Sequence, residues 1–107
     1  MATGILGTPA DLAAATNTTI YTVPAETFSV VTINVVNRNA QSRNVRIALV
    51  SSDSPTDAEF VEYDAELIAN GVLEKSGVVI DAGKKVVVYS DSTGVGAMVY
   101  GIETPTA

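Results

Sequence analysis

Short runs of β-branched residues, separated by turn-forming residues, follow one another along this chain and constrain its fold more than any other feature. Val, Ile, Thr and aromatic residues favour strands, and pairs such as Asn70-Gly71 take the positive φ of tight turns. The predicted strands cover residues 18–23, 28–37, 45–49, 58–67, 72–80, 85–90 and 95–103. Because no helical pattern alternates with them, the sequence predicts an all-β fold. We expect an antiparallel β-sandwich, jelly-roll or immunoglobulin-like, with about seven or eight strands.

Two of these strands carry a local irregularity. The acidic residues of the run 58–67 give it some helical propensity, but its aromatic and β-branched residues and its flanking turns favour a strand. In the run 72–80, Gly77 indicates a β-bulge.

The run Phe28–Asn37 is apolar on both of its faces. Alternate positions place Val31, Ile33 and Val35 on one face, and Phe28, Val30 and Val36 on the other. This pattern is typical of a strand in the centre of a sandwich, or of one between a core and a second protein surface. We expect self-association as a trimer or dimer to bury the second face.

Residues 1–16 lack the strand pattern and are expected to form an N-terminal arm, and the β-sandwich domain is expected to cover residues 17–107. Two glycines and Pro9 favour an extended or turning path at the start. Asp11 is placed to begin one helical turn through the alanines that follow it. The segment also suits a tail that lies on a neighbouring subunit, and the sequence leaves both interpretations open.

The composition of the 107 residues excludes most enzyme chemistry. There is no His and no Cys, which removes the commonest catalytic base, thiolate nucleophiles and zinc sites of the Cys/His type. The formal net charge is −6, and an acidic chain without a basic stripe is unsuited to nucleic-acid backbones. Neither a signal peptide nor an apolar run of about 20 residues is recognisable. We expect no enzyme, no catalytic, cofactor-binding or metal-binding residues, no cofactor, and no nucleic-acid or membrane partner.

Four carboxylates crowd one segment: Glu59, Glu62, Asp64 and Glu66. Paired carboxylates serve glycoside hydrolysis at suitable separations, and a strand would place the last three on one face, where oxygen ligands suit calcium. The chain lacks the Asp-rich loop of calcium-binding hands. A solvated acidic face is therefore the preferred interpretation.

The four tyrosines are the only large amphipathic aromatic residues, and they are Tyr21, Tyr63, Tyr89 and Tyr100. Exposed tyrosines provide stacking platforms for sugars or bases, but these four are spread along the chain. Packing in the core or at strand edges is the simpler role. The arginines between positions 38 and 46 are interpreted as the solvated side chains of a hairpin.

Several strand and turn motifs resemble a known group of proteins. They are Asn17-Thr-Thr-Ile-Tyr-Thr-Val-Pro-Ala, Val31-Thr-Ile-Asn-Val-Val-Asn-Arg, Glu62-Tyr-Asp, Ala69-Asn-Gly-Val-Leu-Glu-Lys-Ser-Gly, Asp81-Ala-Gly-Lys-Lys-Val-Val-Val-Tyr and Val99-Tyr-Gly-Ile-Glu. Together, over positions 17–103, they resemble short β-sandwich virion structural proteins of tailed bacteriophages, including cyanobacterial phages.

The resemblance implies a capsid decoration, or cement, protein that binds the shell in many copies and stabilises it. It implies that the partners are other virion proteins, and the major capsid protein in particular. It also implies that the protein is located in the virion, which is assembled in the host cytoplasm. The alternative is a component of the tail, baseplate or fibre that binds host surface glycans. No site residue is implied.

Overall fold

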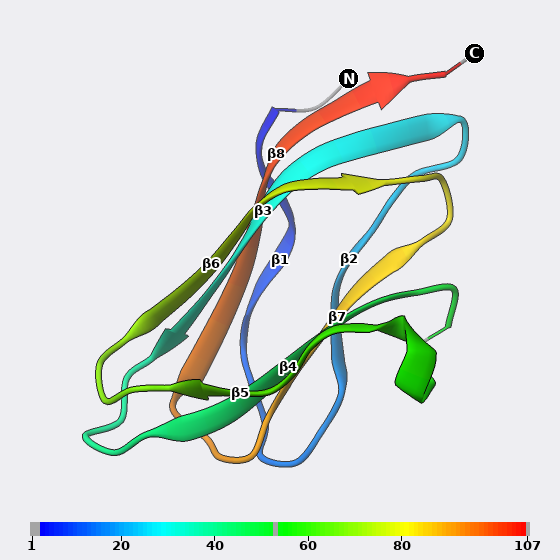
Figure 1. Ribbon diagram of the computed structural model, residues 1–107. Coiled ribbons are helices and arrows are strands. Elements are labelled where there is room, and N and C mark those ends of the chain that lie inside the picture. Colours follow the sequence, from blue (N-terminus) through cyan, green and yellow to red (C-terminus); the bar gives the residue numbers. More distant parts are fainter. Residues whose placement is uncertain (1–2, 53, 107) are drawn as a thin grey trace.

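The computed structural model describes residues 3–52 and 54–106, which form two four-stranded antiparallel sheets (Figure 1). The strands are β1 (Thr3–Asp11), β2 (Thr18–Thr22), β3 (Thr27–Asn37), β4 (Arg43–Val50), β5 (Phe60–Leu67), β6 (Val72–Ile80), β7 (Lys85–Ser90) and β8 (Val95–Pro105). A 3-10 turn, η1 (Asp57–Glu59), precedes β5. Sheet A has the order β1-β8-β3-β6, and sheet B has the order β2-β7-β4-β5. The all-β prediction is confirmed.

The pairing of the strands is nested. β1 pairs with β8, β2 with β7, β3 with β6 and β4 with β5, while the pairs β3–β8 and β4–β7 complete the two sheets. A long hairpin folded over on itself has this arrangement, which is the double Greek key of a jelly roll. Of the two sandwich types that the sequence left open, the topology is therefore that of the jelly roll.

The core lies between the sheets and is built mainly from valine and isoleucine. In β3 the buried positions alternate, with Val31, Ile33 and Val35 facing sheet B. Val86 and Val88 of β7 meet them from the other sheet. Side chains with two groups on Cβ pack well on a pleated surface, which explains why the β-branched runs of the sequence became strands.

The predicted strands and turns agree closely with the observed ones. The run 58–67 forms a strand from Phe60 onward, as predicted. Its helical propensity is expressed only in the single 3-10 turn η1 that precedes the strand. The expected bulge is present, because the register between β3 and β6 shifts by one residue around Gly77, whose φ is 69°. Asp53, in the predicted loop between β4 and β5, lies outside the described residues.

The expectation of an N-terminal arm is corrected by the structure. Thr3–Asp11 is an edge strand of sheet A, and Leu6 and Leu12 belong to the core with 4% and 2% exposure. No helical turn follows Asp11, because the backbone there is tied to the strands: Leu12 N donates to Val95 O at 2.9 Å. Met1 and Ala2 lie outside the described residues.

The edge strand β1 is irregular, which hid it in the sequence. Its pairing with β8 is interrupted between Leu6 and Ala10. At Gly7 it passes directly over β2: φ is 66°, and a Cβ would lie 2.1 Å from the Ile20 carbonyl oxygen. Only glycine fits such a close approach at positive φ. Gly7, which in the sequence favoured an arm with an extended or turning path, instead allows the strand to pack closely against β2.

A buried asparagine ties the loops together at one end of the sandwich. The Asn37 side chain is fully buried, and its two Nδ2 hydrogens are shared among the carbonyl oxygens of Gln41, Leu67 and Ile68, which lie 2.8, 3.0 and 3.1 Å from Nδ2. Its own oxygen accepts from the backbone N–H of Asn39 at 2.9 Å. The β3–β4 and β5–β6 connections are thereby held to the end of β3.

Candidate functional site

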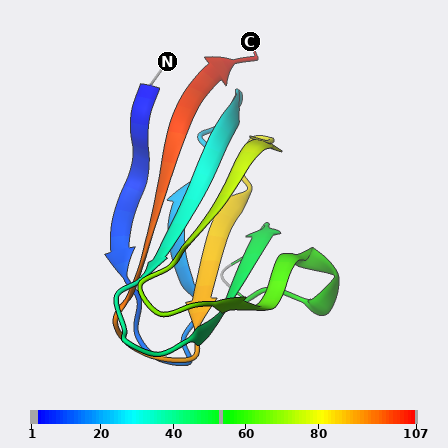
Figure 2. The same ribbon diagram turned by 60° about the vertical axis from the view of Figure 1, so that its left-hand side comes forward.

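The outward side of sheet A is an apolar surface that we call the docking face. Figure 2 shows its four strands side by side, in the order β1, β8, β3, β6. Ile102 of β8 and Val79 of β6 both pair with Val30 of β3, so the three side chains form one row across the sheet. Val30 is the centre of the second apolar face predicted for this strand.

The side chains of the docking face are large, apolar and open to solvent. Val79 is 66% exposed and Ile102 46% exposed, and Ile5 of β1 and Val72 of β6 are exposed by 60% and 56% on the same side. Isolated exposed apolar residues are normal, but four of this size on one face of one sheet mark an interaction surface.

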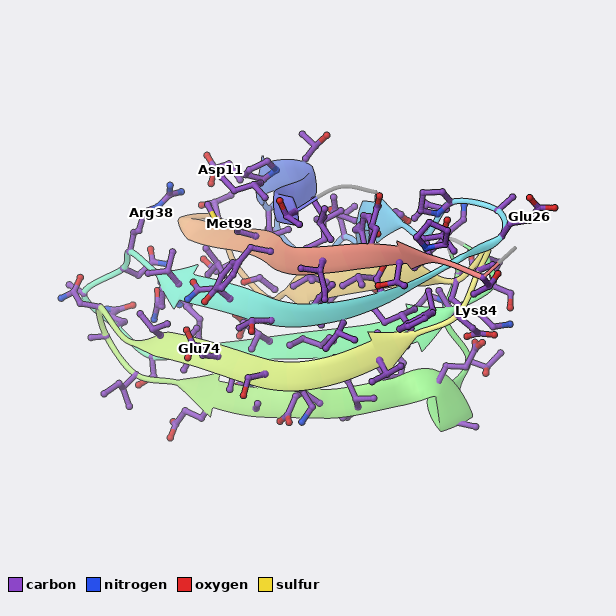
Figure 3. The ribbon with its side chains drawn as sticks, turned by 90° about the horizontal axis from the view of Figure 1, so that it is seen from above. Asp11, Glu26, Arg38, Glu74, Lys84 and Met98 are labelled. Carbon is purple, nitrogen blue, oxygen red and sulfur yellow. The ribbon has the colours of Figure 1, made fainter. Side chains whose placement is uncertain are left out.

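At the other end of this face, between β1, β8 and β3, lies a shallow hollow of about 210 Å³. It opens where β1 leaves β8, and Pro9, Ala10, Asn34, Val36, Arg38, Gly96, Ala97 and Met98 line it. Arg38 forms an ion pair with Asp11 at its rim, and Figure 3 shows these two side chains together with Met98 close by. The hollow thus has an apolar floor and a neutralised rim, which suits a partner's side chain better than a charged ligand.

A polar link crosses the middle of the docking face. The Tyr100 hydroxyl of β8 donates to Glu74 of β6 at 2.8 Å, passing over β3. This hydrogen bond raises the pKa of Tyr100. Asp11 and Glu74 are the acidic residues at outward positions of the described strands of sheet A; Asp11 pairs with Arg38, and Glu74 accepts from Tyr100. Outside the Asp11–Arg38 ion pair, Glu74 is therefore the one other acidic residue at these outward positions.

The outward side of sheet B differs because its own chain covers part of it. Ala48, Val50 and Val87 point outward and are nevertheless buried, with Phe60 packed against them. The segment that leads into β5 is closed by a capping box, in which Thr56 N–H and Oγ1 donate to Glu59 at 2.9 and 3.0 Å. These hydrogen bonds lower the pKa of Glu59.

An arginine and two tyrosines occupy the rest of this side. The Arg46 guanidinium lies 4.1 Å from the Tyr63 ring centre and 4.7 Å from that of Tyr89, and it binds both Asp64 oxygens at 2.7 and 3.2 Å. The guanidinium holds the pKa of Asp64 below its usual value. Phe60 packs edge-on with Tyr63 at 5.1 Å. Arg46 is thus more than a solvated hairpin side chain.

The four carboxylates of the acidic segment do not form a common site. Glu59 caps η1, Glu62 pairs with Lys75 at 2.8 Å across the open edge of the sandwich, and Asp64 pairs with Arg46. A bulge at Asp64, with φ 52°, breaks the alternation that was expected to place Glu62, Asp64 and Glu66 on one face, and Glu66 is exposed opposite Asn44 of β4. Within residues 3–52 and 54–106 there is no group of three or more acidic residues that could hold a metal ion.

The tyrosines are also engaged with the protein itself. Tyr21, of which 5% is exposed, donates to Glu103 at 2.5 Å and contacts Ser29 Oγ at 2.6 Å, joining sheet B to sheet A. Burial, and then the hydrogen bond to Glu103, raise the pKa of Tyr21 to about 12. Tyr63 and Tyr89 hold Arg46, and Tyr100 holds Glu74. The structure therefore gives no support to a row of free stacking platforms for sugars.

The exposed apolar side chains of the docking face are available for contact with a partner. Sequence reasoning identified the outward face of β3, and it placed Ile102 on one face of its own strand, but it did not join Ile5, Val79 and Ile102 into one surface with β3. The alternation of apolar and polar residues along each strand could have indicated that these side chains point outward. The register that aligns them in one row required the structure.

Comparisons of this chain with protein-family models, with curated proteins and with solved structures find no match. The resemblance to phage virion proteins accordingly stays a prediction from strand and turn motifs. In the part of the chain that the structure describes, no helix has the length and apolar character needed to cross a membrane.

Proposed function

We propose that this protein is a bacteriophage virion structural protein that decorates the capsid shell in many copies and stabilises it. The observation that carries the proposal is the docking face, which exposes large apolar side chains on three of the four strands of sheet A and pairs its polar residues Tyr100 and Glu74 with each other. Such a surface is suited to being covered by protein. Many copies on a lattice hold by avidity even where each contact is weak.

The family resemblance supplies the identity of the assembly, and the other features are compatible with it. A jelly roll recurs in viral shells. The partner in the proposal is the major capsid protein, and no residue of this chain is assigned a catalytic role. The tail, baseplate or fibre alternative has no separate support from the tyrosines, which hold protein groups.

The test is the position of the protein in the intact particle. Cryo-electron microscopy of purified virions, with antibody labelling of this chain, is expected to show repeated copies on the outside of the shell. Purified protein added to shells stripped of it should sediment with them and raise their melting temperature. Density confined to the tail would refute decoration and favour the alternative.

A further inference from the structure

From the geometry of the docking face, we infer that it binds a second copy of this chain, forming a two-fold dimer by packing sheet A on sheet A. The inference rests on the proposed function and assigns the docking face to contact between copies, so that the dimer contacts the shell through its other surfaces. Three features carry it: the edges of both sheets, the area of the face, and its charge.

The edges of the sandwich are unsuited to strand-by-strand association. β6 has a bulge at Gly77, β5 has two register shifts, and β2 has five residues with a shift of its own. β1 separates from β8 between Leu6 and Ala10, a stretch that includes Pro9, which lacks an N–H. Bulges, proline and short strands are the devices by which sheet edges avoid pairing with another chain. Contact between copies must therefore use a face.

The docking face is large enough for a stable dimer. Its strands have 9, 11, 11 and 9 residues. Four strands spaced about 4.8 Å apart, with a rise of about 3.3 Å per residue, cover about 600 Å². Two such faces bury about 1,200 Å² in all, above the roughly 1,000 Å² that a specific interface needs. Two sheets pack face to face at about 30° with their side chains interdigitated, as within a sandwich.

The charge distribution favours this face over the rest of the surface. The chain has a net charge of −6, so two copies repel each other at most orientations. On the docking face, Asp11 is neutralised by Arg38 and Glu74 is the one other outward acidic residue of the described strands of sheet A. The apolar row through Val30 therefore meets its own copy with Glu74 as the one acidic residue on each side that lacks a cationic partner in these strands.

Sedimentation equilibrium of the purified full chain tests the inference. We expect a dimer at about 100 μM, and the substitution Val79→Lys should raise its dissociation constant at least about tenfold. The matched control is Ile68→Lys: Ile68 is 65% exposed against 66% for Val79, but it lies in the β5–β6 turn, outside sheet A. The control variant should dimerise within about twofold of the unmodified chain.

A cross-linking measurement covers the case in which Val79→Lys disturbs folding. The chain has no cysteine, so Ile102→Cys introduces a single thiol on a central strand of the face, where a two-fold axis brings it near its copy. A short bismaleimide should link Ile102→Cys into covalent dimers and leave Ile68→Cys monomeric.

A monomeric unmodified chain at about 100 μM would overturn the inference, as would equal dimerisation of the two lysine variants or equal cross-linking of the two cysteine variants. These solution results are separate from the particle test. A monomer on the shell refutes the dimer alone, and a dimer absent from the shell refutes decoration alone.

Discussion

The contact of Tyr21 with Glu103 and Ser29 provides the sharpest test of how the two sheets are held together. Tyr21 has one hydroxyl proton and donates it to Glu103 at 2.5 Å, so Ser29 must be the donor in its 2.6 Å contact with Tyr21. Both Tyr21 and Ser29 are buried. The substitution Tyr21→Phe removes the hydroxyl, keeps the ring and leaves the Ser29 hydroxyl without that acceptor.

The expected cost follows from these partners. A hydrogen bond to a charged group contributes about 1.5–3 kcal/mol, and a buried group left without its partner costs about 1–3 kcal/mol. Because Ser29 retains some freedom to reorient its hydroxyl, we expect a total loss of about 2–3 kcal/mol. For a domain of this size the loss corresponds to a fall in Tm of about 10–20 °C.

The pH dependence of this loss has a definite sign. The pKa of Tyr21 is raised from 10.0 to about 12 in the folded chain. Below pH 10 the tyrosine is neutral in both folded and unfolded chains, so its stabilising contribution is complete. Between pH 10 and 12 the unfolded chain loses the proton first, unfolding is favoured, and the contribution declines.

Urea denaturation monitored by circular dichroism, at steps from pH 7 to pH 11, measures both effects. The difference in free energy of unfolding between the unmodified chain and Tyr21→Phe should be largest near pH 7 and should shrink above pH 10. Tyr100→Phe is the matched control, because Tyr100 also donates to a glutamate but on the exposed surface. The reasoning is refuted if the two variants lose equal stability, or if the Tyr21 difference stays constant with pH.

The remaining predictions concern stability and are measured by urea denaturation. Leu6→Ala should cost about 2–5 kcal/mol because the side chain is buried in the core, and an arm outside the fold would show no change. Gly101→Ala should cost about 1–3 kcal/mol or more, since its Cβ would lie 2.2 Å from the Val30 carbonyl oxygen; a neutral result would contradict the observed β3–β8 spacing. Asn37→Ala should cost about 3 kcal/mol by removing the amide whose two hydrogens three carbonyl oxygens share, and an unchanged midpoint would refute its role.

Most of the strands could be predicted from the sequence because their signals are local. Turn formers such as Asn70-Gly71 interrupt runs of β-branched residues, and Gly77 marks its bulge within one strand. The choice of a jelly roll could not be predicted, because it depends on pairings such as β1 with β8, between residues that are distant in sequence. Local patterns do not encode which distant strands meet.

The strand in residues 1–16 and the docking face could not be predicted for a similar reason: both depend on contacts between strands that are distant in the sequence. Gly7 and Pro9 normally punctuate loops, and here they let an edge strand bend over β2 while Leu6 enters the core. The row on sheet A combines three strands, each of which shows only ordinary alternation. Arg46 and Asp64 meet because of a bulge at positive φ that the sequence did not indicate.

The place of β8 in sheet A has a consequence for how the protein is made. β8 lies between β1 and β3, so during synthesis β1 has no sheet A partner and β3 keeps an open edge until residues 95–105 have left the ribosome. The nascent chain therefore presents apolar strands before its fold can close. We expect closure to follow translation of β8, at the slow rate of a fold dominated by distant contacts, so that aggregation during synthesis is the hazard this chain must avoid.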